Sequence, residues 1–202
     1  MKAIAVYIGL VVLAVPLFLF VPQVDLATSQ FFYNPGSGFI LSDWPPVVLL
    51  ERSVPWITWC WLVLVVGGAA WLFLVGRPLW RLDRKALAFL FASLALGPGL
   101  LANTLLKDHW GRARPTQIEA FGGLQRFTPA PLPAAECERN CAFVSGHAAL
   151  GFSLVAFGFL LPPGRSRNRG VAAALGFGAL VGFGRIIQGG HFLSDVVYAG
   201  LI

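Results

Sequence analysis

Long stretches without a charged residue alternate with short polar stretches along the whole chain. Four of these stretches have about 20 residues or more, enough for a helix to cross a hydrocarbon layer ~30 Å thick. They are residues 3–22, 54–76, 86–106 and 142–164. A fifth stretch, 170–184, is shorter and leads to Arg185, and a sixth runs from Phe192 to Ile202. The pattern predicts a protein made of membrane-spanning helices.

The first and last stretches each leave a question about the ends of the chain. A cleaved signal peptide is the alternative for 3–22, but this run exceeds the ~7–15 residues of a signal core. No small-residue cleavage site follows it, so we expect a retained helix. The last stretch has only 11 residues after His191, whereas a spanning helix needs about 20. We therefore expect the natural chain to continue beyond Ile202, with the last helix truncated here.

Composition and charge agree with the apolar pattern. Charged residues make up 12% of the chain and hydrophobic residues 57%, whereas about 25% of the residues of soluble domains are charged. The net charge is +6, and much of it lies in two short loops, 77–85 and 165–169. Lys and Arg in short loops favour the cytoplasmic side, so the charge requires no nucleic-acid partner. With Lys2, these loops predict a cytoplasmic N-terminus, and they place 23–52, 107–141 and the turn at Gln188 outside.

The three cysteines fit this orientation. Cys137 and Cys141 lie in an outer loop, where an oxidising compartment favours a disulfide between them. Two free thiols are the alternative, and a zinc site is disfavoured because no second ligand pair of suitable spacing follows. Cys60 lies in an apolar stretch, where we expect a buried small hydrophobic residue.

Three groups of polar residues do not suit a passive helix bundle. They are KDHWGRARP at 107–115, Ser145-Gly146-His147, and Arg185 with His191 and Asp195. Simple alternation of helices places all three at the same membrane face. Each has an ordinary interpretation on its own, such as a helix anchor, an N-cap or an arginine reaching the surface. Together they predict a site, because ionisable residues near membrane depth are costly and usually functional.

Two kinds of site fit these residue types. His147, His191 and Asp195 could form a metal site with two histidines and one carboxylate. The cations Lys107, Arg114 and Arg185 argue against this, because they repel a divalent cation and attract phosphate. The Ser145-Gly146 segment adds backbone N–H groups at a helix start, which also suit an anion. The pattern favours a phosphoryl site with no metal or other cofactor.

The same residues resemble the type 2 phosphatidic acid phosphatase superfamily. KDHWGRARP resembles its Lys-x6-Arg-Pro signature, VSGH its Pro-Ser-Gly-His block, and GRIIQGGHFLSD its Ser-Arg-x5-His-x3-Asp block, in the family's order. Val144 stands where the family often has proline, and Gly184 where it often has serine. The resemblance implies an all-α, integral membrane six-helix bundle in a single domain over residues 1–202, with its motif core at 103–202.

The resemblance also implies a metal-independent phosphatase and assigns roles by position. His191 would be the nucleophile that forms a phosphohistidine, Asp195 would orient it, and His147 would protonate the leaving oxygen and then activate water. Five residues would hold the phosphoryl oxygens: Lys107, Arg114, Ser145, Gly146 and Arg185. Arg112 and His109 could contact a second phosphate, a sugar headgroup or only the membrane interface, which we favour. Asn103 lies one helical turn before Lys107 and could face the same pocket.

The substrate is less sharply indicated. The stretches DLATSQFFYNPGSGF, HWGRARP and IQGGHFLSDV resemble bacterial lipid A phosphatases of the same superfamily. This favours a phosphorylated lipid at the periplasmic face of the bacterial inner membrane. Undecaprenyl pyrophosphate and phosphatidylglycerophosphate remain alternative substrates, and transfer of the phosphate to another lipid is an alternative reaction. A non-catalytic bundle that binds an anion or a lipid is the alternative outside enzymes, and the pair His147 and His191 argues against it.

Overall fold

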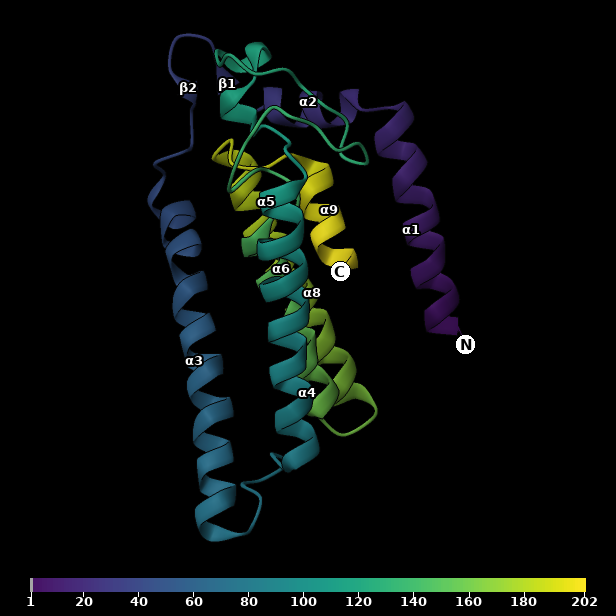
Figure 1. Ribbon diagram of the computed structural model, residues 1–202, viewed down its shortest axis with the longest axis vertical. Helices are drawn as coiled ribbons and strands as arrows, with labels where there is room; N and C mark the ends of the chain where they lie inside the picture. Colours follow the sequence, from purple (N-terminus) through teal and green to yellow (C-terminus); the bar gives the residue numbers. More distant parts are fainter. Residues whose placement is uncertain (1) are drawn as a thin grey trace.

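The computed structural model describes residues 2–202, without the side chains of Lys2 and Ala3, and confirms the all-α class (Figure 1). Its α-helices are α1 (Lys2–Phe20), α2 (Gln23–Gln30), α3 (Pro45–Val75), α4 (Arg84–Leu94), α5 (Lys107–His109), α6 (Gly146–Ser153), α7 (Val155–Leu160), α8 (Arg165–Ile187) and α9 (Leu193–Leu201). A π-helical segment, η1 (Ala95–Leu106), joins α4 to α5, and two short 3-10 turns, η2 (Pro115–Gln117) and η3 (Glu119–Phe121), follow. The strands β1 (Tyr33–Asn34) and β2 (Gly38–Phe39) form a small antiparallel hairpin.

Helices occupy all six predicted stretches, but fewer of them are long enough to span a bilayer. Within residues 2–202, three helices have the length and apolar character of a span: Pro45–Val75, Arg84–His109 and Arg165–Ile187. The pair α1 and α2 adds a fourth if it counts as one span, although it bends by 80°. The apolar helix Gly146–Leu160 is shorter. The described part of the chain thus has three or four candidate membrane spans, as expected of a membrane protein, with shorter helices packed among them.

Two helices begin earlier than the uncharged stretches suggested. α3 starts at Pro45, nine residues before the uncharged stretch at 54, because prolines at the first helical turn suit a helix start. α8 starts at Arg165 inside the basic stretch, so the predicted short fifth run is a 23-residue helix. Long arginine side chains at a helix end can reach the polar interface, so charge does not terminate the helix.

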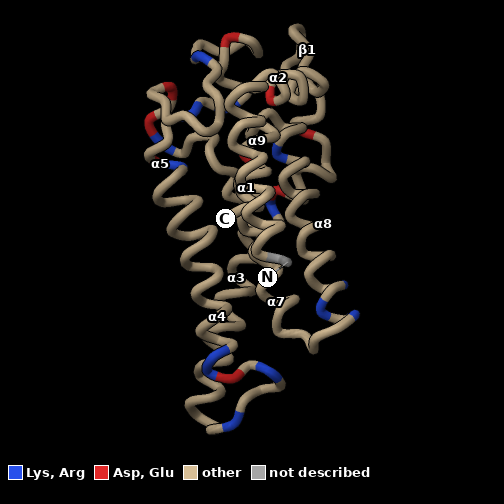
Figure 2. Tube along the Cα trace, turned by 90° about the vertical axis from the view of Figure 1, so that its right-hand side faces the viewer, with Lys and Arg blue, Asp and Glu red and all other residues tan. Residues whose placement is uncertain are grey.

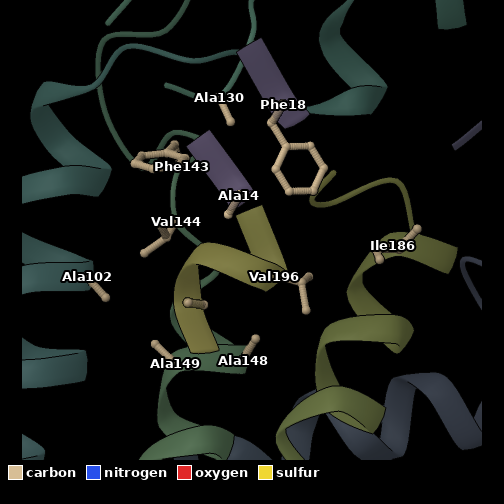
Figure 3. Close-up of a cluster of buried hydrophobic side chains, with 11 residues drawn as sticks. Ala14, Phe18, Ala102, Ala130, Phe143, Val144, Ala148, Ala149, Ile186 and Val196 are labelled. Carbon is tan, nitrogen blue, oxygen red and sulfur yellow. The ribbon is translucent and has the colours of Figure 1, made fainter. Parts of the chain in front are cut away.

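Close helix packing builds the centre of the molecule. A Cβ added at Gly151 of α6 would lie 2.8 Å from the Cα of Gly178 in α8, and one at Gly158 would lie 2.8 Å from Val171 N. Small residues at such crossings let the backbones of membrane helices approach closely. Figure 3 shows Ala14 and Phe18 of α1 beside Val196 of α9 and Ala148 of α6, which belong to one buried cluster. This packing holds α6 and α7 against α8, and the buried cluster adds α1 and α9.

Charged residues lie mostly at the two ends of the molecule (Figure 2). One end, formed by the loop between α3 and α4 and the start of α8, carries mainly Lys and Arg, whereas the end with α2 and α5 carries both acidic and basic residues. A separate aromatic cluster packs beneath the β1–β2 hairpin at that second end, and it includes Phe39, Phe121 and Phe192. Cys60 is exposed and not buried as expected, because only one side of α3 contacts the protein.

Candidate functional site

The three polar groups meet at one end of the bundle, as the helix alternation predicted. Arg185 lies in the last turn of α8, and a glycine turn leads from it to His191. The Nδ1–H of His191 donates to the carbonyl of Ala142, 2.7 Å away, in the segment before α6. The backbone N–H of Ser145 donates to the carbonyl of Asp195 at 3.1 Å. Residues about 50 positions apart in the sequence therefore form one site.

His191 is held as a neutral imidazole with one nitrogen free. Its side chain is 1% exposed, and because a carbonyl only accepts, the bond to Ala142 places the proton on Nδ1. Burial lowers the pKa of His191 to about 4, against the opposing effect of the Asp195 carboxylate, so the ring is uncharged at neutral pH. Nε2 then carries the lone pair that a nucleophile needs.

Asp195 lies close to His191 but does not orient it by a direct hydrogen bond in this structure. Its Oδ2 is 3.7 Å from His191 Nδ1 and accepts the backbone N–H of Phe192 at 2.8 Å. Helix α9 begins at Leu193, so His191 precedes the helix and Asp195 stands in its first turn. The carboxylate is within ion-pair distance of the imidazole, where it can stabilise positive charge that develops on the ring.

His147 lies in the first turn of α6, where the backbone N–H groups of a helix N-terminus can bind an anion. Ser145 is the N-cap, and its Oγ accepts the N–H of Ala148 at 3.4 Å. A side chain at Gly146 would collide with the amide oxygen of Asn103, so the helix start and η1 are in close contact. Burial and the positive charges of Arg185 and Lys107 lower the pKa of His147 to about 4, so this ring is also neutral at neutral pH. The backbone N–H groups at this helix N-terminus suit a phosphoryl group.

Two of the three predicted cations, Lys107 and Arg185, lie near His147, and Arg114 lies near Lys107. Arg114 Nη2 donates to the carbonyl of Asn140 at 2.7 Å. Arg185 pairs with Glu51 of α3, and its Nη1 donates to Oε1 of Gln188 at 2.6 Å. The Nε of Arg185 is buried without a hydrogen-bond partner among the residues that the structure describes. An unpaired buried donor on a cation is suited to an incoming phosphate oxygen.

An apolar groove leads to the site from the side of the bundle. It has a volume of about 530 Å³ and lies between α3 and the helix formed by α4 and η1. Val54, Thr58, Trp59, Leu62, Phe91, Leu94 and Pro98 line its length. Asn103, Lys107, Gly146 and His147 line its polar part, whereas His191 lies deeper and does not line it. The groove thus combines a surface for hydrocarbon chains with polar groups for a phosphate.

One residue of the first motif, Arg112, lies elsewhere than expected. Arg112 is fully buried, so it contacts neither the interface nor an entering headgroup in this structure. Its Nη1 donates to Oδ1 of Asp195 at 2.5 Å and its Nη2 to Oδ2 of Asp25 at 2.8 Å, because a buried guanidinium requires paired acceptors. His109 is exposed, and its Nδ1 faces the carbonyls of its own helix at 3.1 and 3.2 Å.

Sequence reasoning missed Asp25, Ser194 and Glu51. Asp25 and Ser194 are fully buried, and the backbone N–H of Ser194 donates to Asp25 Oδ1 at 2.8 Å. The one available signal was position, since Asp25 follows an apolar helix directly and Ser194 lies inside the third motif.

The disulfide region adjoins the site. Cys137 and Cys141 are joined, with their Cα atoms 5.7 Å apart. The N–H of Cys141 donates to the carbonyl of Lys107 at 3.0 Å, and the next residue, Ala142, accepts from His191. Among residues 2–202, no three His, Cys, Asp or Glu side chains are grouped so that they could hold a metal ion.

The chain is similar to known proteins over most of its length. The family model described as the PAP2 superfamily matches residues 86–202. The lipid A 4′-phosphatase of Francisella tularensis subsp. novicida (strain U112) is 34% identical over 189 residues, which cover 91% of this chain and 83% of that protein. The lipid A 4′-phosphatase of Rhizobium leguminosarum is 43% identical over 110 residues, covering 54% of this chain and 46% of that protein. No solved structure matches the chain significantly.

Proposed function

Because the chain belongs to the PAP2 superfamily and is a membrane lipid phosphatase, we propose that it removes the 4′-phosphate of lipid A by way of a phosphohistidine on His191. The observation that carries the mechanism is the neutral, buried imidazole of His191, whose Nδ1–H is engaged by Ala142 and whose Nε2 is free. The cations around it supply the charge that a phosphate requires.

The first step forms a bond from Nε2 of His191 to phosphorus and breaks the bond from phosphorus to the sugar oxygen. The negative charge of the bound phosphate offsets the nearby cations and lets His147 take up a proton from solvent. His147 then gives this proton to the leaving oxygen, so the sugar departs with a hydroxyl group. The imidazole becomes cationic, and the carboxylate of Asp195, 3.7 Å from Nδ1, compensates that charge. Lys107, Arg114 and the unpaired Nε of Arg185 bind the phosphoryl oxygens.

The second step returns the protein to its starting state. His147, now neutral, removes a proton from water, and the resulting hydroxide attacks phosphorus. The bond between phosphorus and Nε2 breaks, inorganic phosphate leaves, and both histidines recover their first protonation state.

Two features support a lipid A substrate. The groove from α3 to η1 is lined mostly by apolar side chains and ends at Lys107 and His147, which suits acyl chains attached to a phosphorylated head. The related proteins from Francisella and Rhizobium are named as lipid A 4′-phosphatases. We further propose that the site faces the periplasm from the inner membrane, because the basic loops lie at the opposite end (Figure 2).

The test is phosphate release by the detergent-solubilised protein in the presence of EDTA. Lipid A, undecaprenyl pyrophosphate and phosphatidylglycerophosphate are compared as substrates, with His191→Ala and the exposed His109→Ala as a matched pair. We expect release from the 4′ position of lipid A that survives EDTA, persists in the His109 variant and disappears in the His191 variant. Preference for another lipid would refute the substrate, and activity in His191→Ala would refute the mechanism.

A further inference from the structure

A closed network of charged groups lies directly behind the reactive histidine. Arg112, Asp25, Asp195 and Ser194 are all fully buried. The guanidinium of Arg112 reaches Asp195 through Nη1 and Asp25 through Nη2, and its Nε donates to the carbonyl of Thr128 at 2.9 Å. These bonds join the second helix, α2, the loop after α5 and the first turn of α9.

Ser194 closes the network. Its Oγ donates to Asp25 Oδ2 at 2.5 Å and accepts from Arg112 Nη1 at 2.8 Å. Each oxygen of Asp25 therefore has a donor, and so does each oxygen of Asp195. Phe192 packs against the guanidinium, whose carbon lies 4.4 Å from the ring centre. A fully satisfied buried network fixes its members in one arrangement.

The net charge of this network decides how much negative charge Asp195 presents to His191. Two carboxylates and one guanidinium leave one negative charge when all three are ionised. If Asp25 were neutral, Arg112 and Asp195 would cancel, and the imidazole would face a neutral pair. With Asp25 charged, the positive charge of Arg112 is shared, and Asp195 keeps negative charge towards His191 Nδ1, 3.7 Å away.

We propose that Asp25 of α2 is a positioning residue for catalysis, which through Arg112 holds Asp195 in place and preserves its negative charge beside His191. This inference rests on the proposed role of His191 as nucleophile. Asp25 touches neither His191 nor the groove, so it acts only through the network. The helix α2 thereby belongs to the catalytic apparatus, although it lies outside the segment matched by the family model.

The test compares two substitutions with opposite effects on charge and shape. Asp25→Asn keeps the shape and removes the charge, whereas Asp25→Glu keeps the charge and adds a methylene in a closed site. If charge is what matters, kcat falls in Asp25→Asn by about tenfold to a hundredfold, the size of effect that small displacements cause. KM stays unchanged, and Asp25→Glu retains more activity than Asp25→Asn. A purely structural role predicts the reverse order, with the larger side chain more harmful.

Two controls keep the result interpretable. Ser29→Ala changes a buried residue of the same helix whose Oγ has no partner within the described part of the chain, and Asp43→Asn removes an exposed acid. Both should retain wild-type kcat. If Asp25→Asn fails to fold, Ser194→Ala replaces it, since it loosens the network without changing charge and should lower kcat below that of Ser29→Ala.

The outcomes separate this inference from the proposed function. A wild type that releases phosphate, with an inactive His191→Ala variant, upholds the function whatever Asp25 does. Wild-type kcat in folded Asp25→Asn, or a lower kcat in Asp25→Glu than in Asp25→Asn, would overturn the role of Asp25 alone. If Asp25→Asn does not fold, wild-type kcat in Ser194→Ala would overturn it equally.

Discussion

At the scale of single residues, the site depends on a few positions where neither size nor charge can change freely. Gly146 faces the amide of Asn103, His191 is closed off from water, and Arg185 keeps one donor unpaired. Each position combines a constraint from packing with a requirement of phosphate chemistry. Substitutions there should affect function beyond their effect on stability.

The first prediction concerns Gly146. In Gly146→Ala the new Cβ meets Asn103 Oδ1, so α6 or η1 must shift at the phosphate-binding end. Overpacking of this kind costs about 1–3 kcal/mol of stability, and we expect kcat to fall about tenfold or more because the helix start moves. The matched control is Gly67→Ala in α3, where nothing lies within 4 Å of the new methyl group. Equal activity of the two variants would contradict the prediction.

The second prediction follows from the pKa of His191. The folded protein holds this pKa at about 4, below the ordinary 6.5, so the unfolded chain takes up a proton first as pH falls. Stability from this group is therefore complete above pH 6.5 and is lost as pH falls towards 4, by up to about 3 kcal/mol. The melting temperature of the wild type should drop more steeply over this range than that of His191→Asn. Parallel curves would show that His191 is not held neutral by burial.

At the scale of elements, the apolar stretches predicted where helices lie but not where they end. The helix starts at Pro45 and Arg165 lie among polar residues, because proline suits a first turn and arginine can reach the interface. α2 was not predicted, since eight residues of mixed polarity give no strong signal. Its place follows from tertiary contacts, chiefly the buried bonds of Asp25 to Arg112 and Ser194.

For the candidate site too, local sequence predicted some features and not others. Motif spacing and helix alternation predicted that the residues around His147, His191 and Arg185 would meet. They did not predict that Ala142 orients His191 or that Arg112 turns inward. A carbonyl is present at every residue, and a partner 87 positions away leaves no trace in local spacing.

The third prediction concerns the segment closed by the disulfide. This segment presents the carbonyl of Asn140 to Arg114 and leads directly to Ala142, which orients His191. Replacing Cys137 and Cys141 by serine removes about 2 kcal/mol of stability for so short a loop and should lower kcat about tenfold by loosening these carbonyls. Reductant should have the same effect on the wild type. Cys60→Ser is the control and should behave as the wild type does. A reductant effect that persists when Cys137 and Cys141 are both serine would refute the role of this disulfide.

At the scale of the whole molecule, the groove connects the bilayer side of the bundle with the polar end. A lipid could enter between α3 and η1 while its phosphorylated head reaches Lys107 and His147. A water-soluble phosphate ester would not require the apolar part of this route. The two kinds of substrate should therefore respond differently when the groove is filled.

The fourth prediction tests this route. Thr58→Trp places a large side chain in the groove, whereas Val63→Trp places one on the exposed side of the same helix. We expect KM for lipid A to rise about tenfold or more in Thr58→Trp, because the acyl chains lose several apolar contacts with the groove. KM for a soluble aryl phosphate should not change. Equal effects on both substrates, or an effect of Val63→Trp, would argue against lipid entry through the groove.

The most direct test of the account is to trap the phosphorylated intermediate. Protein mixed with substrate carrying labelled phosphate is quenched within the first turnover and digested, and the labelled peptide is sequenced by mass spectrometry. The account predicts phosphate on His191, stable to alkali and labile to acid, and absent from His191→Ala. Phosphate release by an active wild type with no labelled histidine at any time, or with the label on another residue, would contradict it.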